Sequence, residues 1–479
     1  MVAITPHDDA APRDDAAPRD DAVPWDDAVP WDDAVPTGAV PTGALPADAG
    51  PASGAVPARP RWPALAARAL TWAGAFAGYG VAGATAAAAD RLRRRAGSRA
   101  MSRQLARMCV RLGPTFVKGG QLLSTRKDLL PPHWCEALGQ LHDRVDPMTA
   151  AQARAALAAA YPRGSHWPFA ELDLTPVASG SIACVYRAVL HDGRTVAVKV
   201  RRPRIRDRML ADFALLGMGA RVMQSMPGMR RVPARRMVDQ LGFAVLRQLD
   251  LAAESAALTE LRSNLTGLRY FRIPEPLTEV SADGVLVMEF VDDLGRFTPG
   301  EMNNEQRREL IRRVLHGTYQ MLFLDGLVHC DMHPGNLYLT HGCEVVLLDA
   351  GFVVPLEPTV KRLFAEFFLN LSMGRGGECA ENVLDSAEHV PADADTDAFR
   401  AGIVELVAYS TRKTAGEFRL APFATRLFDL QRRCGIAAAP EFIFPLVSLL
   451  VLEGLINEFD IHIDFQAEAV PTLLTALRR

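Results

Sequence analysis

The segment LVHCDMHPGN holds a dense group of side chains that could carry chemistry. His329, Cys330, Asp331 and His333 lie within five positions, and imidazole, thiolate and carboxylate groups are ligands of transition metals. The same letters also put Asn336 five residues after Asp331. The first pattern predicts a metal centre and the second a loop that handles phosphate, so the rest of the chain must separate them.

A second acidic residue supports the phosphate interpretation. Asp349, in VVLLDAG, ends an apolar strand thirteen residues after Asn336. In protein kinases a His-Arg-Asp loop, an Asn five residues after its Asp and a later Asp-Phe-Gly follow this order. Phosphoryl transfer needs a carboxylate to orient the attacking hydroxyl, and two oxygen ligands to hold Mg²⁺ on the phosphates. Asp331 is the candidate for the first role, and Asn336 and Asp349 for the second.

The kinase pattern also makes predictions upstream. A strand-borne lysine should reach the α- and β-phosphates, and TVAVKV provides Lys199. An acidic residue on a later helix should pair with it, and Glu254 is the candidate. The preceding segment, VASGSIACVYRA, supplies a loop of small residues over the nucleotide, namely Ala178, Ser179, Gly180 and Ser181.

Adenine should meet the strand that links the two lobes. VLVMEFVDD offers Met288 at its inner end, and the backbones of Glu289 and Val291 as hydrogen-bonding groups. Together with the loop and the lysine, these positions predict a site for ATP or ADP.

The stretch LGPTFVKGGQLLSTRKDLLPPHWCEALGQLHDRVDP resembles the N-terminal extension of the UbiB/AarF (ADCK-like) atypical kinases. The hallmark of that family is Lys-x-Gly-Gln, here Lys118 to Gln121. The resemblance implies a helical extension over the nucleotide cleft, with Lys118 and Gln121 near the active site. It also implies an ATP-dependent step that supports isoprenoid-quinone or related lipid metabolism.

Three motifs depart from the family pattern. Its Glu-x-Asp motif appears as Gln248-Leu249-Asp250, so the charged partner that Lys118 would have there becomes a neutral amide. The usual Ala-rich loop contains Gly180, which can bring backbone amides closer to phosphate. Asp349 is followed by Ala-Gly, which keeps the Mg²⁺ ligand and removes the aromatic side chain.

These motifs predict an α+β, protein-kinase-like bilobal fold with a small β-rich N-lobe and a helical C-lobe. Residues 61–165 should form the helical extension, 166–291 the N-lobe and 292–479 the C-lobe. Within them, 134–160 and 205–225 are helical in pattern, 234–265 reads as one long helical stretch, and 174–201 reads as strands around the turn at Gly193.

The first 60 residues differ from the rest in composition. They repeat DDAAPR and DDAVPW, and their proline and paired aspartates predict a solvated acidic tail without a core. The whole chain carries −3 and this tail −8, so the remainder carries +5. Seven scattered cysteines without a CxxC pair favour a reducing, cytoplasmic setting.

Residues 69–89 are uncharged and about 31 Å long as a helix at roughly 1.5 Å per residue. Their Ala and Gly content favours a packed or interfacial helix over a spanning one. Arginines then recur at every fourth position from Arg91 to Arg111, a stripe that suits either solvent or an anionic membrane surface. Peripheral membrane association is therefore an expectation, and nucleic acid is not an expected partner.

Only FVVPLEP separates the Asp-Ala-Gly motif from the next helical pattern, and no Ala-Pro-Glu segment follows. We therefore expect a small-molecule or lipid-linked phosphoryl acceptor, or water, rather than a protein, and the family resemblance implies a lipid or isoprenoid molecule as the partner. The alternatives are an aminoglycoside-phosphotransferase-like kinase, a non-catalytic nucleotide-binding scaffold, and the metal centre considered first.

Overall fold

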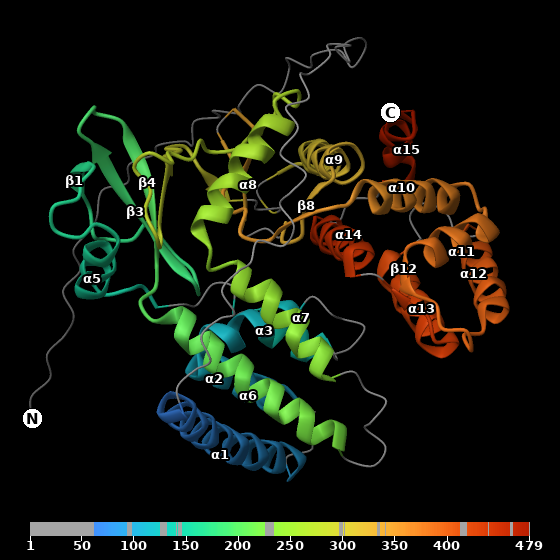
Figure 1. Cartoon of the computed structure of the whole chain (residues 1–479), viewed down its shortest axis with the longest axis horizontal. Coiled ribbons are helices and arrows are strands. Elements are labelled where there is room, and N and C mark those ends of the chain that lie inside the picture. The colour runs from blue at the N-terminus through green and yellow to red at the C-terminus, as the bar shows by residue number, and fades with distance from the viewer. Residues whose placement is uncertain are drawn as a thin grey trace, which may run out of the picture. The chain divides into compact units, whose positions relative to one another are not determined.

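The computed structural model describes residues 62–92, 98–124, 132–139, 141, 146–225, 234–296, 300, 302–332, 336–340, 342–411, 419–438, 440–459 and 463–478. The tail predicted for residues 1–60 lies outside the described residues. The described residues belong to one compact unit, whose helices and strands are drawn in Figure 1.

A five-stranded antiparallel sheet forms where the β-rich lobe is expected (Figure 1). Its strands are β1 Phe169–Leu172, β2 Ala178–Ser179, β3 Ala183–Leu190, β4 Thr195–Arg201 and β6 Val285–Glu289, in the order β1-β3-β4-β6 with β2 paired to β3. The turn between β3 and β4 has Gly193 at φ +85°, a conformation that favours glycine. The predicted turn is therefore confirmed.

Helix α5 (Ala150–Ala160) packs on this sheet. It begins with a capping box in which the Thr149 side chain accepts from the Gln152 amide, and the Gln152 side chain accepts from the Thr149 amide. Ala153 and Leu157 face the sheet core and are buried. The burial of these two side chains holds α5, the last helix before β1, against the sheet.

The extension consists of α1 Trp62–Leu92, α2 Ser98–Leu112, α3 Pro114–Ser124 and α4 Pro132–Gly139. Helix α1 lies along α2 and α6 (Ile205–Ser225), as Figure 1 shows. Within the part of the chain that the structure describes, no helix is both long enough and apolar enough to span a membrane.

A buried carboxylate on α6 joins three of these helices. Asp212 has no exposed surface and accepts from Arg68 Nε (2.5 Å), Trp72 Nε1 (3.0 Å) and Thr115 Oγ1 (2.7 Å). Arg68 also donates to the carbonyl of Leu112. A buried charge needs such complete pairing, so this cluster fixes α1 and α3 on α6.

The helical stretch predicted for 234–265 is two helices, α7 Ala234–Arg247 and α8 Leu251–Asn264. The helical character predicted for this stretch is confirmed, but residues 248–250 separate the two helices. The Asp250 side chain accepts from the amides of Ala252 and Ala253 (3.1 and 3.0 Å), so Asp250 caps a new helix. Asp and Asn side chains compete in this way with helix continuation.

The rest of the described chain is mainly helical, and its short strands form one four-stranded and two two-stranded sheets. The helices are α9 Asn304–Tyr319, the π-helix η3 Gln320–Asp325, α10 Pro358–Ser372, α11 Gly376–Asp385, α12 Thr396–Thr411, α13 Leu420–Cys434, α14 Pro440–Glu458 and α15 Phe465–Ala476. The strands are β5 Phe271–Arg272, β7 Gly295–Arg296, β8 Leu327–His329, β9 Leu337–Leu339, β10 Val345–Leu347, β11 Val353–Pro355, β12 Ala387–His389 and β13 Ala437–Ala438.

Candidate active site

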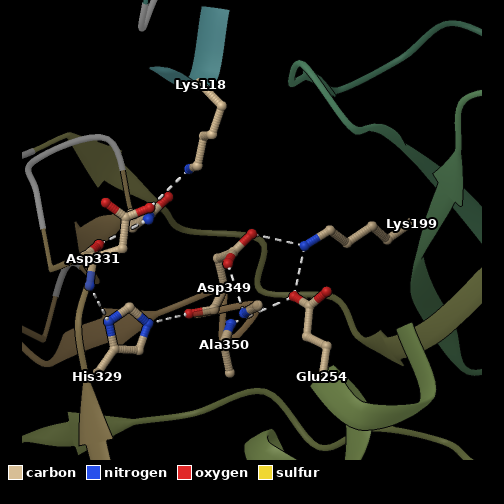
Figure 2. Close-up of polar contacts among 9 residues, drawn as sticks. Lys118, Lys199, Glu254, His329, Asp331, Asp349 and Ala350 are labelled. Carbon is tan, nitrogen blue, oxygen red and sulfur yellow. Dashed lines mark hydrogen bonds and ion pairs between the residues drawn. The ribbon is translucent and has the colours of Figure 1, made fainter. Parts of the chain in front are cut away.

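Lys199 connects the sheet with two acidic residues that are distant in sequence. On β4 it lies opposite Leu286 of β6, and its Nζ donates to Glu254 Oε1 (2.6 Å) and Asp349 Oδ2 (2.7 Å), as Figure 2 shows. Glu254 is in the first turn of α8, and Asp349 follows β10. The three residues predicted to serve the nucleotide phosphates therefore meet.

The acidic residues of this group differ in electrostatics. Burial raises the pKa of Glu254 to about 7, against the opposing effect of Lys199. Burial also disfavours the charged form of Asp349, yet the charge and hydrogen bond of Lys199 hold its pKa well below the usual range. Asp349 also has 37% of its side chain exposed, so it is an ionised carboxylate that a ligand can reach.

The loop after β8 is organised by His329, which is 1% exposed. The amide of Asp331 donates to His329 Nδ1 (3.2 Å), so Nε2 carries the proton and donates to the Asp349 carbonyl (2.6 Å; Figure 2). Burial lowers the pKa of His329, which agrees with this neutral form. The histidine therefore links the two aspartates through their backbones.

Asn336 belongs to the same loop. Its Nδ2 donates to the backbone carbonyl of Asp331 (2.9 Å), which directs the amide group back toward the aspartate. The side-chain oxygen is then the atom that a metal ion would take. The chain from 333 to 335, which includes His333, lies outside the described residues.

These contacts argue against a transition-metal centre at this loop. Both ring nitrogens of His329 are used by backbone groups, and the buried Cys330 thiol donates to the Val328 carbonyl (3.7 Å). Among the residues that the structure describes, no three His, Cys, Asp or Glu side chains gather as metal ligands would. Asp349 and Asn336 instead fit Mg²⁺, which binds through one or two protein oxygens together with phosphates and water.

Lys118 of α3 reaches the loop from the extension. Its Nζ donates to Asp331 Oδ2 at 2.9 Å, and both side chains are largely buried (Figure 2). Within the extension, a Cβ at Gly120 would lie 2.5 Å from Leu141 Cδ1, so the absence of a side chain there lets α3 pack closely on this neighbour.

Lys118 thus forms an ion pair with Asp331, although the charged partner of the family's Glu-x-Asp motif is replaced here by the neutral Gln248. Asp250 uses its carboxylate to cap α8. Gln121 lies within α3, but its side chain is outside the described residues.

The loop of small residues lies between β2 and β3. Ala178 and Ser179 pair with Val185 and Cys184, and the amide of Gly180 donates to the Ala183 carbonyl (2.9 Å). The Gly180 amide is therefore engaged within the loop, and Ser181 comes next.

Glu289 is the last residue of β6, and Val291 lies two residues beyond the strand. The amide of Glu289 donates to the Glu275 carbonyl (2.8 Å), and its carboxylate accepts from Arg272 (2.6 Å). Met288 is opposite Ala197 of β4 and is buried. Binding of adenine by the backbones of Glu289 and Val291 stays a prediction.

One further contact was not foreseen from the sequence. Ser448 of α14 is buried and donates through Oγ to the carbonyl of His329 (2.8 Å). A lone serine in an apolar helix gives no sequence signal of such a role, because only the tertiary fold brings α14 behind the loop.

A small antiparallel sheet with an ion-paired lysine, joined to helices that hold an Asp-Asn loop and a second aspartate, defines a protein of the protein-kinase-like class. Residues 140–382 match the model of the ABC1 atypical kinase-like domain family, and the chain belongs to that family. The UbiB/AarF resemblance of the sequence is therefore confirmed.

Several bacterial relatives bear the name "Probable protein kinase UbiB". The chain is 33% identical over 373 residues to the one from Aeromonas hydrophila, and 31% over 375 residues to the one from Aliivibrio fischeri. Each alignment covers 76% of this chain and 68% of the relative. A solved structure, of the complex of Rv3197 and erythromycin from Mycobacterium tuberculosis, has a TM-score of 0.51 at 20% identity. It covers 75% of this chain and 92% of that one, which supports the fold.

Proposed function

We propose that this protein is a Mg²⁺-dependent atypical kinase or ATPase that binds ATP or ADP. The observation that carries the proposal is the contact of Lys199 with both Glu254 and Asp349, at 2.6 and 2.7 Å. The carboxylate of Glu254 can keep Lys199 in position through their hydrogen bond while the Lys199 ammonium group contacts the phosphates. Asp349, ionised and partly exposed, can then turn an oxygen to the metal.

The remaining roles follow from chemistry and position. Asp331 would accept or orient the attacking hydroxyl, and Asn336 and Asp349 would hold Mg²⁺. When bound, the ion would neutralise phosphate charge and orient the transferred group. The neutral His329 would keep the two aspartates in register through its backbone contacts.

A small acceptor is favoured by the chain after Asp349. Strand β11 ends at Pro355 and α10 begins at Pro358, which leaves little chain for a peptide-docking segment. We propose a lipid or isoprenoid molecule, or water, as the acceptor. A role in isoprenoid-quinone metabolism is also part of the proposal, because the family resemblance implies such a role.

We further propose that the enzyme works at the cytoplasmic face of a membrane. Helix α1 exposes four large apolar residues, Trp62, Leu70, Phe76 and Val81. Helix α2 exposes Arg103, Arg107 and Arg111. Apolar and basic groups on adjacent helices suit an anionic lipid surface.

The test is nucleotide binding and ATP hydrolysis with and without Mg²⁺, for the wild type and Asp349→Asn. We expect the variant to lose most of the Mg²⁺-dependent gain in affinity, about tenfold or more, because a metal ligand and its charge are removed. Asp385→Asn, an exposed change on α11, is the control and should behave as wild type.

Anionic liposomes provide the second arm, in which wild-type hydrolysis should rise. An unaltered Mg²⁺ effect in Asp349→Asn would remove this residue from the site. Binding without any turnover would make the protein a nucleotide-binding scaffold, and indifference to liposomes would remove the membrane from the proposal.

A further inference from the structure

Arg202, just beyond the end of β4, ties the loop of small residues to another part of the chain. Its Nε donates to the Gly180 carbonyl (3.0 Å), and its Nη2 donates to Ser179 Oγ (3.0 Å) and to the Asp146 carbonyl (2.7 Å). Asp146 belongs to the segment that leads from the extension to α5. One guanidinium therefore spans two segments that are separated by more than thirty residues in sequence.

A second set of contacts supports the same connection. The buried Cys184 on β3 accepts through Sγ from the Met148 amide (3.4 Å), and its Sγ lies 3.6 Å from Ser179 Oγ. Ser179 is thus held by Arg202 on one side and is next to Cys184 on the other. The position of the loop relative to residues 146–148 is over-determined by these contacts.

The contact with Gly180 has a directional consequence. In a trans peptide the carbonyl and the following amide point in opposite directions, so the Ser181 N–H points away from Arg202. The Gly180 amide is already used by Ala183, whereas no described residue accepts from the Ser181 amide. The Ser181 amide is therefore the loop donor that a phosphate oxygen can take.

We propose that Arg202 is a positioning residue for nucleotide phosphates, because it fixes the Gly180-Ser181 peptide so that the Ser181 amide faces the ligand. The inference rests on the proposed function, in which this loop covers a nucleotide. The planar guanidinium suits the task, since it fixes several acceptors in one geometry and lowers the cost of ordering the loop on binding.

The experiment compares the wild type with Arg202→Ala and Arg202→Lys in the full chain. Affinities for Mg-ADP and Mg-ATP are measured by calorimetry, and that for adenosine by ligand-detected NMR. We expect Arg202→Ala to bind both nucleotides about tenfold more weakly, the effect of one charge-assisted hydrogen bond. Adenosine has no phosphate, so its affinity should stay unchanged.

The variants distinguish a positioning role of Arg202 from an effect of its charge and from an effect on folding. Lysine keeps the charge without the forked contacts, so Arg202→Lys should also bind nucleotide more weakly, and wild-type affinity would overturn the proposal. Equal losses for ADP and adenosine, or none for ADP, would overturn it too. The control is Arg206→Ala, an exposed arginine on α6 that should have no effect.

A double-mutant cycle with Ser179→Ala tests the shared contact. Because Ser179 and Arg202 hydrogen-bond to each other, their effects on ADP affinity should be non-additive, and strict additivity would contradict the proposal.

Hydrogen exchange tests the loop without nucleotide. The Gly180 amide should exchange faster in Arg202→Ala than in the wild type. If the wild type binds no nucleotide, the proposed function fails, while this measurement still shows whether Arg202 holds the loop. Unchanged exchange would then refute the positioning role independently.

Discussion

Lys118 and Asp331 are 213 positions apart, yet their side chains form an ion pair of 2.9 Å inside the site. The extension thus supplies a cation to the carboxylate that phosphoryl transfer would use to orient its acceptor. An oxygen engaged by Lys118 is less open to a substrate hydroxyl. Under the proposed function, this contact predicts that α3 restrains the reaction in the conformation of the structure.

Replacement of Lys118 should release this restraint. Lys118→Met keeps much of the side chain's length but removes the charge, so we expect ATP turnover to rise several-fold in a phosphate-release assay. Lys118→Arg preserves an ion pair and should stay near wild type. A fall in turnover for Lys118→Met would mean that the lysine assists the chemistry.

Glu254 should make stability depend on pH. Its pKa is raised to about 7 in the folded protein, so the folded state binds a proton more tightly than the unfolded state. The protonated Glu254 therefore contributes to the free energy of unfolding. This contribution is fully present below the ordinary carboxyl pKa of 4.5 and is lost as the pH rises through about 7. Asp349 has the opposite sign, since its lowered pKa affects stability only at more acidic pH.

The measurement is urea unfolding between pH 5 and 8. Between these two pH values the free energy of unfolding of the wild type should fall by on the order of a few kcal/mol more than that of Glu254→Gln, because glutamine cannot ionise. Glu260→Gln, on the exposed face of the same helix, should retain the wild-type slope. Parallel curves for the wild type and Glu254→Gln would show that Glu254 keeps its ordinary pKa.

Asp212 should be a strong determinant of stability. Its removal leaves Arg68, Trp72 and Thr115 without their shared buried acceptor. We expect Asp212→Ala to lower the free energy of unfolding by about 3–5 kcal/mol, as when one partner of a buried ion pair is lost. Asp207→Ala, exposed on the same helix, is the matched control for urea unfolding. A similar small effect of both changes would contradict the proposed anchoring of α1 and α3.

Sequence patterns predicted the parts of the site that depend on local order. Lys199 on an alternating strand, Asp331 with Asn336, and Asp349 after an apolar strand have local patterns, and the structure brings Lys199 and Asp349 together. A contact between single residues of elements that are distant in sequence leaves no local pattern in the sequence. The cap of Asp250 broke a helix that hydrophobic periodicity had joined, because a single side chain outweighed the pattern.

The same distinction applies to the supporting contacts. Lys118 was identified from a motif, but its partner was not, because that partner depends on where the tertiary fold places α3 relative to the loop that holds Asp331. Neither Arg202, which follows β4, nor Ser448 in α14 belongs to a recognisable sequence motif, and only the tertiary structure brings them to Gly180 and His329.

Ser448 allows a test of how far α14 positions the loop. Loss of its hydroxyl removes the donor to the His329 carbonyl, so the backbone between His329 and Asp331 should gain freedom. We expect Ser448→Ala to lower kcat several-fold with little change in the KM for ATP, because the Lys199 contacts are untouched. The unfolding free energy should fall by only about 1 kcal/mol, the usual net value of one hydrogen bond.

Ser410→Ala is a matched control for this change. Ser410 is also buried, and its hydroxyl donates to the Leu406 carbonyl within α12 (2.8 Å). Its replacement should cost similar stability through the lost hydrogen bond and leave kcat unchanged. If both variants lose stability alike and neither changes kcat, Ser448 only supports the fold. A lower kcat in Ser448→Ala alone would mean that α14 sets the geometry of Asp331 through the backbone of His329.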